Sequence, residues 1–469
     1  MAPAPAIVWF RQDLRLADQP ALAAALDDGP VLPVFVLDDA APGRWAMGGA
    51  SRWWLHHSLA SLDADLRARG SRLILLRGDA VTLIADLAAA TSARSVHAMY
   101  HYEPWARRQE SELARRLALT LHHGLTLAPP ARMTTKTGGA FKVFTPFWQA
   151  LQQMMPPLPP RPAPDRIPLA EGAPAGDTLG DWGLCPTAPD WAHGFAPVWQ
   201  PGEAGARQRL ADFADLAAGY GEARDRCAEE ATSRLSAHLH FGELSPATAW
   251  HAIAEAAGPA GQAWLRQLGW RDFSLNLLLN APDLADVNWR RTFDAFPWVR
   301  DDAALTRWQH GQTGYPIVDA GLRQLWRTGW MHNRVRMIAA SFLIKDLMID
   351  WRAGETWFWD TLVDADLANN AAGWQWTAGS GADASPYFRI FNPVSQGRRF
   401  DPAGAYVRQW VPELAGLPDD LIHAPWEAPP ALLAAAGVRL GETYPAPMVD
   451  HARARDRALA AYKAMGERG

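Results

Sequence analysis

Cysteine is nearly absent from this chain of 469 residues, which contains only Cys185 and Cys227. So few cysteines exclude a disulfide framework, and the lack of CxxC spacing excludes a cysteine-rich iron–sulfur site and indicates no metal. The chain also lacks an apolar run long enough to span a membrane, and residues 1–6 lack the basic region of a signal peptide. We therefore expect a cytoplasmic protein.

An excess of positive charge is missing as well, because the formal net charge is −5. The whole chain is thus not drawn to nucleic acid, although local arginines could still bind phosphates, since counterion release depends on the contacting residues. Each arginine taken singly is by default interpreted as part of a solvated surface. The C-terminal third contains Arg323, Arg327, Arg334, Arg336, Arg389, Arg398 and Arg399.

Tryptophan, by contrast, is abundant. The chain has 24 Trp, more than its 16 Phe or its 8 Tyr. Most of these indoles should fill cores, yet such a chain has many chances to line a planar ligand or to relay electrons.

The first 130 residues alternate short apolar runs with helical patterns. Strands are predicted at 7–10, 31–37, 73–76 and 95–100, and helices at 20–26, 50–69, 81–90 and 106–121. This alternation predicts an α/β domain at 1–130 with a doubly wound parallel sheet. Because no GxGxxG follows the first strand, ordinary dinucleotide binding is unsupported.

The composition changes after this domain. Residues 131–200 are rich in proline and predict a linker between domains. From 201 to 469 the strand signals vanish, which predicts an all-α domain. Its expected helices are 207–216, 247–256, 261–279, 318–327, 333–349 and 453–465.

Residues 330–393 combine indoles, arginines and side-chain amides with almost no ordinary catalytic residue between them. Hydrolytic chemistry needs a nucleophile, a base and an oxyanion donor. Flat π-surfaces, cations and neutral amides suit a large aromatic cofactor, a flipped nucleobase or electron hopping instead. The segment therefore indicates flavin and nucleic acid.

Two further patterns agree with this interpretation. Hydroxyls and backbone N–H groups at 232–236, before a helical stretch, can cradle a diphosphate, although such clusters are more often simple N-caps. Trp264, Gln267, Trp270 and Arg271 share one helical face, which fits the wall of a polar aromatic pocket better than a core stripe.

Taken in order, these motifs resemble the DNA photolyase/cryptochrome family, and most closely its bacterial branch that repairs cyclobutane pyrimidine dimers. The resemblance implies the two-domain fold described above, bound FAD, UV-damaged DNA as partner, and light-driven electron transfer to a flipped-out dimer. It is carried by residues 9–16, 232–236, 313–316, 329–336, 373–376 and 388–393.

The family's cofactor positions can be carried over residue by residue. The resemblance places FAD against Tyr220, Thr232, Ser233, Leu235, Ser236, Trp264, Arg336, Asp364, Asp366 and Asn370. Asp364 and Arg336 would set the charge near the flavin or form a structural ion pair. Asn370 would face flavin N5, where a neutral amide can accept or donate a hydrogen bond and so tolerates the reduced flavin that repair requires.

The same resemblance assigns the remaining positions. Trp374, Trp351 and Trp298 match the chain of indoles that carries electrons to the flavin. The lesion would lie between Trp270 and Trp376, above Asn333 and Met337. Cations near the DNA or the lesion would be Arg224, Arg271 and Arg334.

One position departs from the dimer-repair branch, which has Glu where this chain has Gln267. A carboxylate there can accept a hydrogen bond from a thymine N3–H and stabilise the dimer radical anion through a nearby proton or hydrogen bond. Gln keeps an acceptor and adds a donor, but it removes the charge. The (6-4) photolyases resemble this chain at that position but place His where this chain has Asn333. Dimer repair is the main hypothesis, and (6-4) repair is an alternative.

Three further expectations concern partners. A signalling photoreceptor of the cryptochrome type is the other alternative, and the predicted helix 453–465 leaves no long signalling tail before Gly469. A second, antenna chromophore (a folate or a deazaflavin) could bind near 102–108, where Ala106 replaces an acid that some folate-binding relatives use. We expect a monomer.

Overall fold

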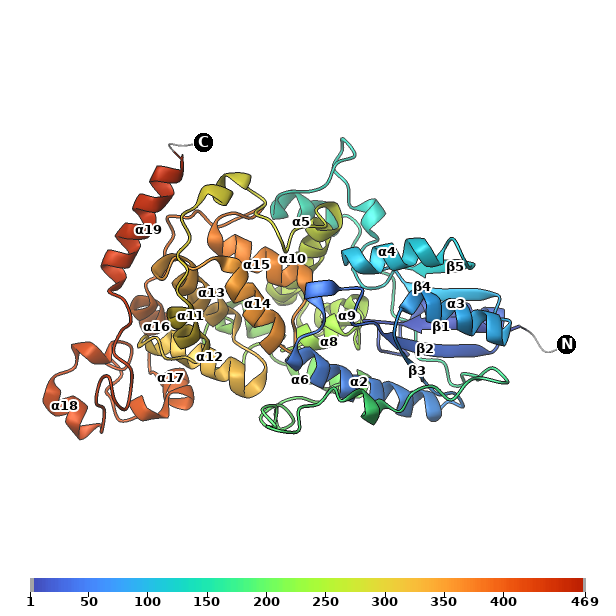
Figure 1. Ribbon diagram of the computed structural model, residues 1–469, viewed down its shortest axis with the longest axis horizontal. Coiled ribbons are helices and arrows are strands. Elements are labelled where there is room, and N and C mark those ends of the chain that lie inside the picture. Colours follow the sequence, from blue (N-terminus) through green and yellow to red (C-terminus); the bar gives the residue numbers. More distant parts are fainter. Residues whose placement is uncertain (1–3, 467–469) are drawn as a thin grey trace. The chain divides into compact units, whose positions relative to one another are not determined.

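The computed structural model describes residues 4–466, which divide into two compact units. The first unit comprises Met1–Gly221, Ser233–Pro282 and Val363–Ala368. The second unit comprises Glu222–Thr232, Asp283–Leu362 and Asn369–Gly469. The three domains expected at 1–130, 131–200 and 201–469 stay a prediction, because the two units interleave in the sequence. Figure 1 labels the helices and strands along the chain.

The first unit contains a five-stranded parallel sheet in the order β3-β2-β1-β4-β5. Its central strand β1 pairs Ile7 with Leu32 on one side and with Val96 on the other. The chain order therefore reverses between β1 and β4, as in doubly wound folds, which confirms the predicted fold class. The strands are β1 Ala6–Phe10, β2 Val31–Leu37, β3 Ile74–Arg77, β4 Ser95–Met99 and β5 Leu119–His122.

The predicted helix 106–121 is partly wrong. Helix α4 spans Pro104–Leu113, and the chain then forms the edge strand β5. An edge strand pairs on one side only, and the residues of β5 are at most half-buried. It therefore has no continuous apolar run that would distinguish it in the sequence.

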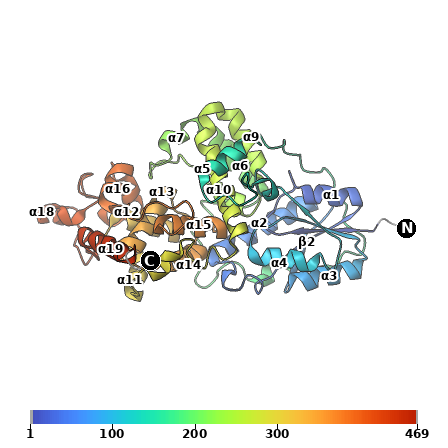
Figure 2. The same ribbon diagram turned by 90° about the horizontal axis from the view of Figure 1, so that it is seen from above.

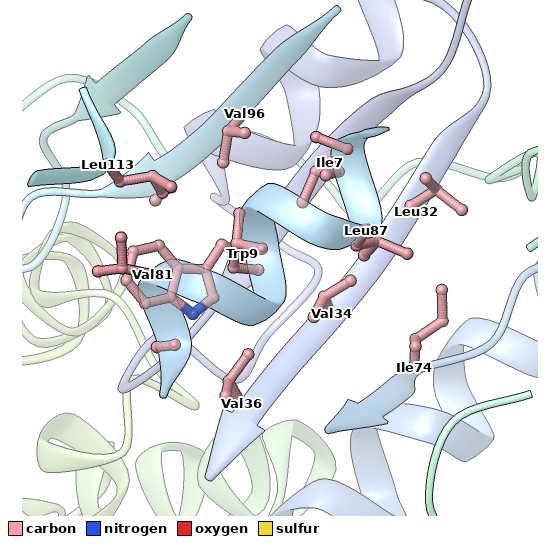
Figure 3. Packing of buried hydrophobic residues seen from close by; sticks show 14 of the residues in the cluster. Ile7, Trp9, Leu32, Val34, Val36, Ile74, Val81, Leu87, Val96 and Leu113 are labelled. Atoms are coloured by element: carbon pink, nitrogen blue, oxygen red, sulfur yellow. The ribbon is translucent and has the colours of Figure 1, made fainter. Parts of the chain in front are cut away.

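The sheet is covered on both faces (Figure 2). Helix α1 (Pro20–Asp28) packs on one face, and α3 (Ala80–Thr91) lies with α4 on the other. Asp79 accepts from the Thr82 N–H and so begins α3. Figure 3 shows the apolar layer between α3 and the strands, where Trp9, Val34 and Leu87 belong to one buried cluster.

The remaining helices complete the first unit. Helix α5 lies within the predicted linker. Its residues Phe144, Phe147, Trp148 and Leu151 form a helical apolar stripe, which the surrounding prolines obscure in the sequence. Besides α1, α3 and α4, the helices of the first unit are α2 Gly49–Arg67, α5 Phe144–Gln152, α6 Glu203–Ala214, α8 Ser236–His240, α9 Pro246–Ala257 and α10 Gln262–Asn280.

The second unit contains helices and no named strand among its described residues. Its helices are α11 Asp302–Gln309, α12 Pro316–Thr328, α13 Asn333–Ser341, α14 Trp351–Thr361, α16 Pro393–Phe400, α17 Ala405–Trp410, α18 Pro430–Ala435 and α19 His451–Gly466. A single π turn, Phe342–Asp346, follows α13, so the predicted helix 333–349 is shorter than expected. Two helices cross the division between the units, α7 Tyr220–Ala223 and α15 Leu367–Ala378.

A buried carboxylate explains the motif at 313–316. Asp319 is fully buried and accepts hydrogen bonds from the Thr313 N–H and hydroxyl, the Gly314 N–H and the Tyr444 hydroxyl. Burial raises the pKa of Asp319, while these donors oppose the shift. The motif therefore holds α12 to the segment around Tyr444.

Two findings concern membrane spans and metal sites in residues 4–466. None of the helices described there is long and apolar enough to cross a bilayer. In the same residues no group of three or more His, Cys, Asp or Glu side chains could hold a metal ion.

Candidate functional site

Residues 233–236 of the first unit form a backbone turn before a short helix. Arg234 has a left-handed φ of +51°, and Leu235 follows in the right-handed region. Such an alternation turns successive N–H groups toward one side and forms a concavity that favours anions. Helix α8, which begins at Ser236, has only five residues.

Two hydrogen bonds connect this turn to predicted cofactor residues. The Ser236 hydroxyl donates to the buried carboxylate of Asp364 at 2.6 Å, and the Trp264 indole N–H donates to the Ser233 hydroxyl at 3.1 Å. The ring of Phe213 lies 5.8 Å from that of Tyr220 and 5.6 Å from that of Trp264. The structure thus brings these predicted residues together within the first unit.

The two predicted acids have separate partners. Asp366 lies 3.4 Å from His240 Nδ1, while Asp364 accepts from Ser236. In the second unit, Arg336 donates through Nε to the Met331 carbonyl at 2.8 Å. The pairing of Asp364 with Arg336 stays a prediction.

Helix α10 places its predicted wall residues as follows. Trp264 is buried, whereas Gln267, Trp270 and Arg271 are half-buried. The Trp270 ring stacks on that of Phe144, with ring centroids 3.6 Å apart and planes inclined by 7°. Gln267 donates through Nε2 to the Ala263 carbonyl one turn back at 3.1 Å. One face of the Trp270 ring is therefore occupied by Phe144.

A buried carboxylate that the sequence analysis missed supports this helix. Asp272 is fully buried, accepts from the Leu127 N–H at 2.7 Å and lies 3.4 Å from Arg271 Nη1. Arg271 also donates to the carbonyls of Leu125 and Leu239. Arg271 thus holds α10 to other segments, and its predicted contact with DNA stays a prediction. The adjacent opposite charges at 271 and 272 were the available signal.

Burial raises the pKa of Asp272 to about 7, against the opposing effects of the Arg271 guanidinium and the Leu127 N–H. The carboxyl group next to the wall of α10 therefore titrates near neutral pH. Its charge state affects how firmly Arg271 is held.

Two predicted cations of the second unit share one carboxylate. Arg334 contacts Asp225 through Nη2 at 2.7 Å and through Nε at 3.3 Å, and its guanidinium lies over the Phe400 ring. Arg224 Nε lies 3.9 Å from the same carboxylate. Asp225 was missed, because a carboxylate more than one hundred residues before Arg334 shows no relation to it in the sequence.

The predicted floor of the lesion site lies at the start of α13. Asn333 is its first residue and is exposed, and Met337 follows one turn later. The Met337 sulfur lies 3.9 Å from Arg334 Nη1. These three residues therefore belong to one face of the helix.

Asn370 is fixed by a backbone carbonyl. Its Nδ2 donates to the Glu355 carbonyl at 3.0 Å, which fixes the plane of the amide and directs its oxygen to the opposite side. A neutral amide held in this way can donate to or accept from a ring nitrogen, and the contact of Asn370 with flavin N5 stays a prediction.

The three indoles of the predicted electron chain all lie in the second unit. Trp374 is buried against Phe358 and Trp308, with ring centroids 5.0 and 6.2 Å away. Trp351 is fully buried and donates to Asn288 Oδ1, and half-buried Trp298 contacts Phe296. Trp374 and Trp298 thus contact other aromatic rings, and the Arg352 guanidinium lies over the Trp351 ring. Because these contacts do not join one of the three indoles to another, the order of electron hops stays a prediction.

The predicted lesion residue Trp376 is half-buried on α15, next to a buried amide that the sequence analysis missed. Gln375 donates to the carbonyls of Leu284 and Val287 and accepts from the Trp289 N–H. These three bonds fix the rotation of α15 and therefore the directions in which Trp374 and Trp376 leave it.

The predicted antenna region lies at the carboxyl ends of β4 and β5. Tyr102, Glu103 and Ala106 are buried there, and the guanidinium of Arg107 lies over the Tyr100 ring. A cavity of about 270 Å³ adjoins this region. It is lined by Tyr100, His123, Met133, Gly139 and Asn280 among others.

Comparison with known proteins supports the resemblance along most of the chain. Residues 6–165 match a family model described as DNA photolyase, and residues 264–464 match one described as the FAD binding domain of DNA photolyase. The chain therefore contains the FAD-binding domain of this family.

Individual relatives cover nearly the whole chain. A deoxyribodipyrimidine photo-lyase of Agrobacterium fabrum is 50% identical over 98% of both chains. Cryptochrome-1 of Arabidopsis thaliana is 38% identical over 96% of this chain and 69% of its own length.

Solved structures agree with this. A bacterial class III photolyase of Agrobacterium tumefaciens matches with a TM-score of 0.95 and 49% identity, covering 100% of this chain and 98% of that one. An archaeal photolyase of Sulfolobus tokodaii, solved with two FAD molecules, matches with a TM-score of 0.82 and 27% identity over 98% and 100%. By fold, by motif and by similarity over its whole length, this chain belongs to the DNA photolyase/cryptochrome family.

Proposed function

We propose that this protein is a deoxyribodipyrimidine photo-lyase that splits cyclobutane pyrimidine dimers in UV-damaged DNA. The observation that carries the proposal is the Trp270 ring, which stacks on Phe144 through one face and is half-buried. We infer that an extruded base stacks on the other face of this ring. Stacking on such a surface offsets part of the cost of unstacking a damaged base, which is already poorly paired.

The residues of the chain fit the flavin that this chemistry requires. Bound FAD in its reduced form would supply, on excitation by light, the electron that splits the dimer. The turn at Arg234 and Leu235, with the hydroxyl of Ser233, offers N–H and O–H donors of the kind that hold a diphosphate. Tyr220, Thr232, Trp264, Arg336, Asp364, Asp366 and Asn370 complete the proposed cofactor set.

The cations of the second unit would position the DNA rather than react. Arg334 is held by Asp225, and Arg224 lies beside the same carboxylate. A phosphate arriving there would compete with Asp225 for guanidinium donors, and such contacts carry no sequence information. Since no general acid or base is required for electron transfer, the absence of a nucleophile from the predicted set is consistent with the proposal.

The decisive experiment is illumination of the purified, reduced protein with oligonucleotides that contain either a cyclobutane dimer or a (6-4) product. We expect blue light to restore the two pyrimidines of the cyclobutane dimer. A dimer that is bound but never split contradicts the proposal. Splitting of the (6-4) product alone would favour the alternative that Gln267 suggests. Binding without any splitting would favour the photoreceptor alternative, which the similarity to a plant cryptochrome supports.

The first prediction concerns Gln267. Gln267→Glu should raise the yield of dimer splitting per absorbed photon, because a carboxylate would stabilise the dimer radical anion through a hydrogen bond or a nearby proton. The yield is measured with the same oligonucleotide. Gln262→Glu, at an exposed position of the same helix, is the matched control. An unchanged yield in Gln267→Glu would mean that this position does not set the efficiency.

We further propose that a second chromophore binds beside Tyr100 and Arg107, near the carboxyl end of β4. Parallel sheets bind ligands at their carboxyl ends, close to the point where the strand order reverses. The expected result is a second chromophore released together with FAD when the protein is denatured. Release of FAD alone from protein purified in the dark from its natural source would contradict this.

A further inference from the structure

One face of the Trp270 ring in the first unit is covered by a residue of another helix. Phe144 of α5 is 1% exposed, and its ring lies nearly parallel to that of Trp270, with centroids 3.6 Å apart and planes inclined by 7°. At this separation two parallel rings are in van der Waals contact across most of their faces. A segment whose proline content predicts a linker therefore supplies the surface on which Trp270 rests.

Helix α5 is firmly attached to α10, and the two lie side by side in both ribbon views (Figure 1, Figure 2). Phe147 packs on Phe273 with ring centroids 5.3 Å apart, and Phe144 meets the same ring at 5.8 Å. Trp148 lies directly on Gly269, because a Cβ added to that glycine would be 2.4 Å from Trp148 Cε3. These contacts are separate from the stacked indole, so Phe144 forms a rigid support for it.

The support matters because the backbone of α10 does not fix the plane of the indole. The hydrogen bonds of Arg271 and Asp272 hold the helix to residues outside it. The Trp270 side chain still rotates about two side-chain bonds, and without Phe144 its half-buried ring would have room for other rotamers. Binding that must immobilise such a side chain loses affinity. A ring already held in one plane avoids that loss.

We propose that Phe144 is a positioning residue for lesion recognition, which holds the Trp270 ring in the plane on which an extruded dimer stacks. Because this role requires a base to stack on Trp270, it rests on the proposed function. Stacking on an aromatic side chain strengthens binding about 5- to 150-fold per base. Undamaged DNA keeps its bases within the duplex and does not use this surface. Phe144 should therefore affect the binding of damaged DNA alone.

The test measures in the dark how tightly the FAD-loaded protein binds an oligonucleotide with one cyclobutane dimer and the same oligonucleotide without it. The ratio of the two affinities is the discrimination. Phe144→Leu keeps a bulky apolar side chain but removes the flat ring. It should weaken binding of the dimer about tenfold, within the range of one lost stack, and leave binding of undamaged DNA unchanged. At saturating protein, the yield of splitting per absorbed photon should stay close to that of the wild type, because Phe144 acts on binding and not on electron transfer.

Phe147→Leu is the matched control. Phe147 lies on the same helix, is also 1% exposed, and packs on Phe273 and Phe141, whereas Phe144 stacks on Trp270. The two substitutions remove the same atoms from one core and should lower stability alike. A merely structural role of α5 predicts equal discrimination in the two variants. The positioning role predicts that only Phe144→Leu loses discrimination.

A double-mutant cycle isolates the contact between the two rings. Trp270→Leu should itself reduce the affinity for the dimer. Adding Phe144→Leu to Trp270→Leu should cause no further loss of discrimination, because the supported ring is gone. An equal loss from Phe144→Leu with and without the indole overturns the inference. If Phe144→Leu fails to fold, Phe144→Met takes its place in the cycle, since the flexible Met side chain fills the same space.

The outcomes separate this role from the proposed function. A wild type that binds both oligonucleotides equally and never splits the dimer overturns the proposed function and the inference together. A wild type that discriminates and splits the dimer, with equal discrimination in Phe144→Leu and Phe147→Leu, overturns the inference and leaves dimer repair untouched. A loss of discrimination confined to Phe144→Leu supports the inference.

Discussion

The wall of α10 in the first unit and the indoles around α14 and α15 in the second unit are positioned by different forces. On α10, Arg271 and Asp272 form hydrogen bonds to the backbone of residues far away in the sequence. Around α14, Trp374 is held by contact with Phe358, Trp308 and Gly354. The first arrangement depends on charge and therefore on pH, whereas the second depends on shape.

The difference fits the proposed tasks of the two regions. A surface that binds a charged polymer such as DNA needs polar groups near it. Other contacts must hold these groups in place, because otherwise their side chains could cover the ligand site. A donor of electrons needs a fixed position and apolar surroundings, which close packing provides without any ionisable group. Each of the following changes tests one side of this contrast.

The largest effect is expected from Arg271→Ala. Removing the guanidinium would leave Asp272 buried without its cation, and breaking a buried charge pair in this way costs about 3–5 kcal/mol. Denaturant unfolding at pH 8, where Asp272 is ionised, should show this loss of stability, and the loss should shrink at pH 5. Arg266→Ala, at an exposed position of α10, is the control and should change stability little. An equal loss at both pH values would contradict the role given to charge.

A smaller effect is expected from Gly354→Ala. A Cβ at this position would lie 2.1 Å from Trp374 Cη2 and 2.7 Å from Leu343 Cδ2, so the indole must move. Overpacking of this kind costs about 1–3 kcal/mol. Flash photolysis should also show weaker tryptophan oxidation, because the indole leaves its position.

Gly373→Ala is the matched control for this change. The Cβ added there meets nothing within 4 Å, and Gly373 lies in a helix, where Ala is favoured. We expect unchanged or slightly increased stability and normal photochemistry. If both substitutions behave alike, shape does not position Trp374.

A further effect is expected from Asp272→Asn, read as a change in the pH dependence of stability. Burial raises the pKa of Asp272 from 3.8 to about 7, so the folded state binds its proton more tightly than the unfolded state does. Its stabilising contribution is complete below pH 3.8 and is lost as the pH rises through about 7. The unfolding free energy of the wild type should therefore decrease over this range relative to that of Asp272→Asn. Parallel pH profiles would contradict the assignment.

Some features could be predicted because their signals are local. The strands β1 and β2 and the helices α9, α10 and α12 follow from apolar runs and helical periodicity within single segments. The strand β5 and the helix α5 could not be predicted in the same way, because one is a half-exposed edge strand and the other interrupts a proline-rich segment. Propensity is a weak guide where packing with distant residues decides the conformation.

The candidate site shows the same division. Motifs identified Trp264, Asn370 and Trp374 as candidates, because family resemblance depends only on which residue occupies which position. Three other features had no signal in the sequence. Gln267 donates a hydrogen bond to its own helix, and Asp225 contacts both Arg224 and Arg334. The buried hydroxyl of Tyr387 has no hydrogen-bond partner among the described residues.

By itself, then, the sequence determined the class of fold, the family and the identity of the residues that could act. Only the tertiary structure decided which of those residues is held by a buried charge, such as Arg271, and which by close packing, such as Trp374. The physical reason is that hydrogen bonds and van der Waals contacts form between groups brought together by folding, often from residues more than one hundred positions apart. Their energies are therefore absent from any local pattern of residues.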